Sequence, residues 1–187
     1  MKLSGLIAIF LFFVCHSFGQ QRDPENLYAT NSGYVHFVSD APLELIEATS
    51  NELKGLIDTK KQTFAFTILT RSFQGCNSPL QQEHFYENYI EAHIYPAASF
   101  EGRIIEDVDL LSRGRHRVRA KGILNIHGVA QERVIHVNIT TGEDKISASA
   151  TFDVMLKDHD ITIPKMVYQK ISEKITVTVE LEFLPRE

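Results

Sequence analysis

The chain has 187 residues, a formal net charge of -5 and a hydrophobic fraction of 43%. This length fits one domain, and the acidic charge, with basic residues that are dispersed, argues against a nucleic-acid-binding protein. Only Cys76 lies outside the N-terminal segment that contains Cys15, which excludes a fold held together by internal disulfides.

The N-terminal segment has the pattern of a secretory signal peptide. Lys2 precedes an unbroken apolar run from Leu6 to Val14, and the small residues Ser17 and Gly19 follow. This order of positive charge, apolar run and small residues is typical of a segment that is removed on export. We therefore expect residues 1–19 to be cleaved near Gly19 and residues 20–187 to form one exported domain, periplasmic or secreted.

Two other interpretations of this segment are less favoured. The apolar run is shorter than a membrane-spanning helix, which needs about 20 apolar residues. A lipid anchor on Cys15 would normally require a small residue before the cysteine, and Val14 is not small. No later segment has the length and apolarity to span a bilayer, so no stable transmembrane segment is expected.

Alternation of apolar and polar residues dominates the rest of the chain. Such alternation predicts strands with one dry and one wet face, as in antiparallel sheets. Turn signals at Ser112–Gly114, Gly128 and Thr141–Asp144 separate several of these runs. The predicted strands are Gly33–Ser39 and Glu52–Asp58, with weaker patterns, then Thr63–Leu69, Arg117–Ile126, Val134–Thr140, Lys145–Val154 and Ile175–Phe183.

One segment, Ser78–Ala92, departs from the strand pattern. Pro79 near its start suits the first turn of a helix, with Ser78 or Asn77 as the cap. The spacing of its larger side chains is close to helical, at Leu80, His84, Phe85 and Tyr89. We expect one short helix here and a second short turn near residues 164–170.

About eight alternating strands and one or two short helices define an all-β chain. Too little helix is predicted to cover an open sheet, so the dry faces must meet in a closed barrel or a sandwich. An eight-stranded antiparallel barrel encloses a space that suits one small ligand.

The dry faces of these segments carry several large or aromatic side chains. Small residues, Ala120, Gly122, Ala148 and Ala150, interleave with them and leave volume inside a barrel. The alternative is that all these side chains fill a solid core. The candidate ligand-binding residues are Phe64, Phe66, Ile68, Phe85, Tyr89, Tyr95, Phe100, Leu124, Ile126, Phe152 and Val179.

No motif predicts a catalytic, cofactor or metal site. The histidines form no HExxH pair, and GxSxG and glycine-rich phosphate loops are both absent. Asp158 and Asp160 flank His159 and have the chemistry for acid–base work, but a solvated loop explains them equally well. A hydrolase or metal enzyme is therefore the least favoured function.

Three segments, in order, resemble the YceI-like family of exported lipid-binding proteins. They are Asn77–Gly102, with Tyr95-Pro96 and Phe100 to Gly102, then Ala120–Val137 and Phe152–Phe183. The sequence departs from the family at residues 158–161, where an aromatic residue and a glycine are replaced by His159 and Asp160. We therefore expect one end of the barrel to differ in shape from that of the family.

The resemblance implies an extended, lipocalin-like barrel with an apolar lumen. It also implies a long amphiphilic ligand, such as a polyisoprenoid, and no cofactor. We expect an exported carrier or buffer of an amphiphilic lipid, and the alternative is a non-enzymatic structural or interaction module with a solid barrel. Nothing in the sequence decides the oligomeric state.

Overall fold

The computed structural model describes residues 26–186, so the expected signal peptide, residues 1–19, lies outside the described residues. The strands are β1 (Leu27–Asp40), β2 (Leu45–Asp58), β3 (Thr63–Leu69), β4 (Gln74–Gly75), β5 (Ala97–Ile104), β6 (Gly114–Ile126), β7 (Val129–Thr141), β8 (Ile146–Met155) and β9 (Lys174–Pro185). Short helical segments lie between them: η2 (Thr70–Ser72), α1 (Pro79–His84), η3 (Phe85–Tyr89), η4 (Leu156–His159) and η5 (Lys165–Val167).

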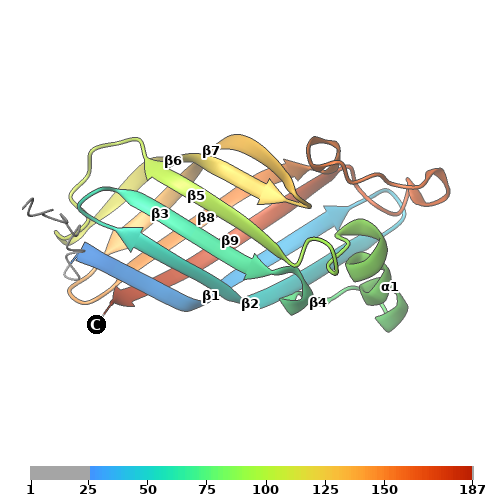
Figure 1. Cartoon of the computed structure of the whole chain (residues 1–187), viewed down its shortest axis with the longest axis horizontal. Helices are drawn as coiled ribbons and strands as arrows, with labels where there is room; N and C mark the ends of the chain where they lie inside the picture. The colour runs from blue at the N-terminus through green and yellow to red at the C-terminus, as the bar shows by residue number, and fades with distance from the viewer. Residues whose placement is uncertain (1–25, 187) are drawn as a thin grey trace, which may run out of the picture.

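Eight of these strands close into an antiparallel barrel. The order is β1-β9-β8-β7-β6-β5-β3-β2, and pairing of β1 with β2 completes the circle. The two-residue β4 adds to β2 outside this circle, where Gly75 is paired with Ala48. Figure 1 shows the strongly tilted strands of the elongated barrel, with α1 and the η5 segment at the same end. The predicted eight-stranded antiparallel barrel is therefore confirmed.

Strand alternation sets which side chains enter the barrel. Along β6, Val118, Ala120 and Leu124 are buried while Arg115, Arg117, Arg119 and Lys121 are exposed. These four basic residues thus form a solvated strand face, and two of them form ion pairs, Arg119 with Glu106 and Lys121 with Glu132.

β6 and β7 are joined by a two-residue hairpin turn. His127 and Gly128 are its central residues, with φ angles of 54° and 73°, and Ile126 is paired with Val129. Positive φ at both central positions is the requirement of a type I′ turn, whose twist matches that of the flanking strands. A side chain on Gly128 would also collide with the Tyr95 ring, at 2.5 Å.

Gly122 has a different role from the one predicted. It does not contribute open volume to the lumen, because its partner across the ladder is Gly102 and the two backbones approach closely. A Cβ on Gly102 would lie 2.1 Å from the Lys121 carbonyl oxygen, and a Cβ on Gly122 would lie 2.2 Å from the Glu101 carbonyl oxygen. Both glycines are needed for close contact between β5 and β6.

The expected helix over Ser78–Ala92 is shorter and changes type. α1 begins with Pro79 in its first turn, and the Ser78 hydroxyl accepts a hydrogen bond from the Gln81 amide at 3.2 Å. The chain then widens into the π-helical turn η3 and leaves the helix at Glu91, whose φ is 45°. No helix within residues 26–186 has the length and apolarity to cross a membrane.

The ladder between β7 and β8 is the shortest between neighbouring strands of the barrel. Their ladder contains only the pairs from Asn138 with Ser149 to Thr141 with Ile146, although both strands continue further. Side chains replace the missing ladder bonds: Arg133 Nη2 donates to the Asp153 carbonyl at 2.5 Å, and Gln131 Nε2 donates to the Asp158 carbonyl at 2.8 Å. Beyond the ladder, β7 is therefore joined to β8 and to η4 by side-chain hydrogen bonds.

Candidate functional site: an apolar barrel cavity

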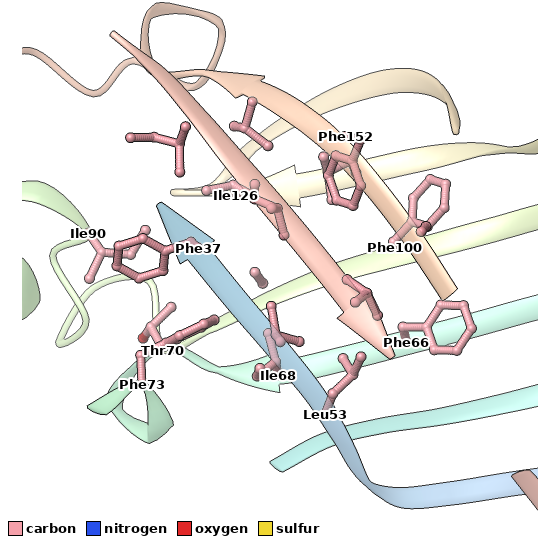
Figure 2. Close-up of a pocket in the computed structure, with 18 of the residues that line it drawn as sticks. Phe37, Leu53, Phe66, Ile68, Thr70, Phe73, Ile90, Phe100, Ile126 and Phe152 are labelled. Carbon is pink, nitrogen blue, oxygen red and sulfur yellow. The ribbon is translucent and has the colours of Figure 1, made fainter. Parts of the chain in front are cut away.

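The barrel interior contains a cavity of about 530 Å³. This volume lies within the range of small-molecule sites, about 300–1,000 Å³. The lining comes from the inward faces of all eight barrel strands and from α1, η3 and the loop that contains η5. In Figure 2, Phe37, Phe66, Phe100 and Phe152 project from different strands around one common space. The inward side chains therefore leave a hollow rather than a solid core.

The structure brings nearly all the candidate ligand-binding residues to this cavity. Tyr95 is the exception: its ring packs on His127, with ring centroids 4.4 Å apart, and it does not line the cavity. Because Gly128 and His127 fix its position, Tyr95 supports the β6–β7 turn instead. The residues in the lining are Phe64, Phe66, Ile68, Phe85, Tyr89, Phe100, Leu124, Ile126, Phe152 and Val179.

Sequence reasoning missed Phe37 and Phe73, which form an aromatic group with the predicted residue Phe85. Phe37, Phe73 and Phe85 pack together, with centroids 5.2 Å apart for Phe37 and Phe85 and 5.4 Å for Phe37 and Phe73. All three line the cavity. Alternation of Val35, Phe37 and Ser39 was a usable signal for β1, whereas Phe73 lies in an irregular segment between η2 and β4 and no periodicity marks it.

One end of the cavity is closed by packed apolar side chains. Val118, Ile146 and Phe183 are almost completely buried there, and Leu110 from the loop between β5 and β6 packs against them. Phe66 and Phe100 contact this cluster from the cavity side. We call this the closed end.

The opposite end, which we call the polar end, carries the charged residues of the lining. Glu44 comes from the β1–β2 turn, Gln81 from α1 and Lys170 from the loop after η5, and all three line the cavity. Glu44 Oε1 accepts hydrogen bonds from Asn77 Nδ2 at 3.0 Å and from Gln81 Nε2 at 2.9 Å. Hydrogen bonds from Asn77 and Gln81, with a smaller effect of the Lys170 charge, hold the pKa of Glu44 below its usual range.

Acid is expected to loosen α1 at the polar end. A carboxylate whose pKa is lowered on folding stabilises the fold above its unfolded pKa, and this contribution is lost as pH falls through the folded pKa. Lowering the pH from 7 to about 3 should therefore reduce the protection factors of the α1 backbone amides, which compare the observed exchange rate with the intrinsic rate at the same pH. Glu44→Gln keeps an oxygen acceptor but does not titrate, so α1 in this variant should lose most of the acid dependence. Equal acid dependence in both proteins would contradict this role of Glu44.

Cys76 also lies in the lining and has no disulfide partner among residues 26–186. Burial raises the pKa of its thiol. The protonated form is a poor nucleophile, so Cys76 contributes packing to the lining rather than a reactive thiol.

Two buried histidines, His127 and His159, connect three segments of the chain next to the cavity. His127 Nε2 lies 2.7 Å from Glu91 Oε2, and its Nδ1 donates to the His159 carbonyl oxygen at 3.0 Å. The His159 ring is fully buried, and its Nδ1 donates to the Val129 carbonyl at 3.2 Å. These bonds join the segment after η3, the β6–β7 turn and η4.

These contacts give the residues 158–161 a structural role. Asp160 adopts the left-handed conformation, with φ of 55°, which glycine favours and aspartate tolerates. His159 is buried, so it is not part of an exposed acid–base group with Asp158 and Asp160. Within residues 26–186, no three His, Cys, Asp or Glu side chains are grouped to hold a metal ion.

A closed antiparallel barrel with an apolar interior defines a class of ligand-enclosing β-barrels. The YceI-like domain model matches residues 30–183, and the chain therefore belongs to the YceI-like domain family. No curated protein matches the sequence significantly.

Solved structures share the fold at low sequence identity. A polyisoprenoid binding domain from Saccharophagus degradans, implicated in plant cell wall breakdown, aligns with a TM-score of 0.72 and 15% identity over 86% of this chain and 99% of its own. BcnA of Burkholderia cenocepacia aligns with a TM-score of 0.67 and 16% identity over 80% of this chain and 95% of its own. The Campylobacter jejuni YCEI protein gives a TM-score of 0.55 and 18% identity over 100% of both chains.

Proposed function

We propose that this protein is an exported carrier or buffer of an amphiphilic lipid, with the apolar tail in the barrel cavity and the head group at the polar end. One observation carries the proposal: the cavity is lined by apolar side chains along its length, and its charged lining residues, Glu44 and Lys170, lie together at one end. A lipid has the same distribution of polarity. The residues that line the cavity are then the ligand-binding residues.

The driving force is removal of the lipid tail from water. Each buried methylene gains about 0.8 kcal/mol, so a tail of even modest length supplies a large favourable term. Ordering of the chain offsets part of it, since real affinities do not exceed about -21 kcal/mol. Such binding tolerates variation in tail chemistry, while the polar end orients the head group.

Two further observations favour a long-chain ligand. The Saccharophagus degradans domain that shares this fold is described as polyisoprenoid binding, which supports an isoprenoid among the candidate ligands. The N-terminal pattern of charge, apolar run and small residues supports export, and residues 20–187 then form the single mature domain. A binding role without catalysis fits a cavity whose charged groups are few and lie at one end.

Native mass spectrometry of the gently purified protein tests this function. We expect a protein species with a discrete additional mass, and organic extraction should release an amphiphilic lipid from it. A denatured aliquot of the same sample should give the mass of the chain alone, which controls for covalent modification. A protein that carries no lipid and takes up none from detergent solution would instead support a non-enzymatic interaction module.

A further inference from the structure

Exposed apolar side chains surround the polar end of the barrel. Met166 is 94% exposed and Tyr168 63% in the η5 loop, and Leu43 is 66% exposed in the β1–β2 turn. Leu80 of α1 and Leu45 at the start of β2 are also largely exposed. We call these five residues, Leu43, Leu45, Leu80, Met166 and Tyr168, the rim.

Hydrogen bonds make the rim one surface rather than three separate loops. The Leu43 amide donates to the Gln169 carbonyl at 2.9 Å, which joins the β1–β2 turn to the η5 loop. Asn77 Nδ2 donates to the Leu45 carbonyl at 2.9 Å, which joins the same turn to the start of α1. Figure 1 shows the three segments together at the α1 end of the barrel.

The rim is continuous with the cavity. Leu80 belongs to both, and Val167 and Lys170, which flank rim residues in the η5 loop, line the cavity. A lipid leaving the cavity at this end would therefore pass directly between exposed apolar side chains. Large exposed apolar patches are otherwise unfavourable on a soluble protein and mark interaction surfaces.

From this arrangement we infer that the rim docks on the surface of a lipid bilayer, so that the lipid passes between membrane and cavity at the polar end. This inference rests on the proposed lipid-carrier function. Leucine and methionine side chains insert at the boundary between head groups and acyl chains, and tyrosine favours the interface itself. The exposed apolar side chains of the rim would be buried at such a boundary, which explains their exposure in the free protein.

The charges of the rim segments indicate to which lipid compositions the rim binds. Two lysines, Lys165 and Lys170, face four acidic residues in these segments, so the rim is not net basic; the acidic residues are Glu44, Glu83, Asp160 and Glu173. Binding is then driven by apolar insertion and needs no anionic lipid. Phosphatidylcholine vesicles should be bound, and raising the salt concentration to about 0.5 M should change the bound fraction by less than about twofold, because screening acts on charge and not on apolar contact.

Co-sedimentation with phosphatidylcholine vesicles tests the inference on the whole purified protein. The double variant Leu43→Asp, Met166→Asp should lower the bound fraction by about tenfold or more, because charged side chains resist insertion. The matched control is Leu111→Asp, Leu184→Asp, which alters two comparably exposed leucines near the closed end and should bind as the unaltered protein does. Thermal melting of all three proteins shows that each is folded.

The outcomes separate docking from lipid binding. Retained lipid in native mass spectra of the rim variant, with vesicle binding lost, supports both proposals. No vesicle binding by the unaltered protein, or equal loss in both double variants, overturns the docking inference and leaves lipid carriage standing. Light scattering tests one alternative, in which the rim is an interface between two copies of the chain. A dimer of the unaltered protein and of the control variant, a monomer of the rim variant and no vesicle binding would show that this alternative is right and the docking inference wrong. Rim-dependent vesicle binding by a protein that never holds lipid would reject the carrier and keep the docking surface.

Discussion

Replacing Phe66 with glutamate should abolish lipid retention and lower the free energy of unfolding by about 3–5 kcal/mol, which is the usual cost of losing a buried phenylalanine and introducing a charge. Phe66 lies on the cavity side of the closed end, with its ring centroid 5.4 Å from Phe64 and 6.0 Å from Phe183. It also covers Gly55, where a Cβ would lie 2.3 Å from the ring. The carboxylate would have no partner among these groups.

The neighbouring residue supplies the control for this experiment. Thr67 follows Phe66 on β3 but faces solvent, so Thr67→Glu should retain lipid and melt close to the unaltered protein. Lipid retention is measured by native mass spectrometry and stability by urea denaturation. Normal retention in Phe66→Glu would show that the lipid does not occupy this cavity.

A second variant covers the case in which Phe66→Glu does not fold. Ala150 faces the cavity from β8 and contributes little volume. Ala150→Phe adds apolar bulk without charge, and we expect it to fold and to retain less lipid because the space is partly filled. Full retention by a folded Ala150→Phe would contradict an occupied lumen at that position.

Much of the barrel could be predicted from the alternation of apolar and polar residues. Where the predicted bounds of a strand are wrong, the cause is local. Strands such as β6 and β9 have one dry face and one charged face, so their pattern is clear. β1 was predicted only from Gly33 to Ser39 because its pairing with β2 shifts register between Thr30 and Val35, and a shift of register interrupts alternation. β2 was predicted from Glu52 only, although it begins at Leu45.

The cavity wall was easier to predict than its polar end. Wall residues such as Phe64 and Phe152 follow directly from the face of the strand on which they lie. Glu44, Gln81 and Lys170 come from three separate segments that meet only through tertiary contacts, so no spacing in the sequence relates them. Whether a set of inward side chains is solid or hollow also depends on strand tilt and packing, which alternation does not specify.

Gly102→Ala is expected to destabilise the fold by about 3 kcal/mol, because overpacking at a close contact forces the backbone to move. The new Cβ would lie 2.1 Å from the Lys121 carbonyl oxygen and 2.5 Å from the Gly122 Cα. Neither atom belongs to a flexible side chain, so β5 and β6 must separate, and the hydrogen bonds between them weaken. Urea denaturation monitored by circular dichroism measures the change.

A second glycine separates this steric effect from the general effect of removing a glycine. At Gly142, in the β7–β8 turn, an added Cβ would meet its nearest neighbour, the Lys145 carbonyl oxygen, at 3.4 Å. Gly142→Ala should therefore be close to neutral, or stabilising by up to about 1 kcal/mol, since alanine restricts the unfolded chain. Similar stability of the two variants would mean that β5 and β6 are not in close contact at Gly102. A large loss of stability in Gly102→Ala alone would show that the glycines at residues 102 and 122 allow β5 and β6 to pack closely in the barrel wall. Their role is then to maintain the wall and not to enlarge the lumen.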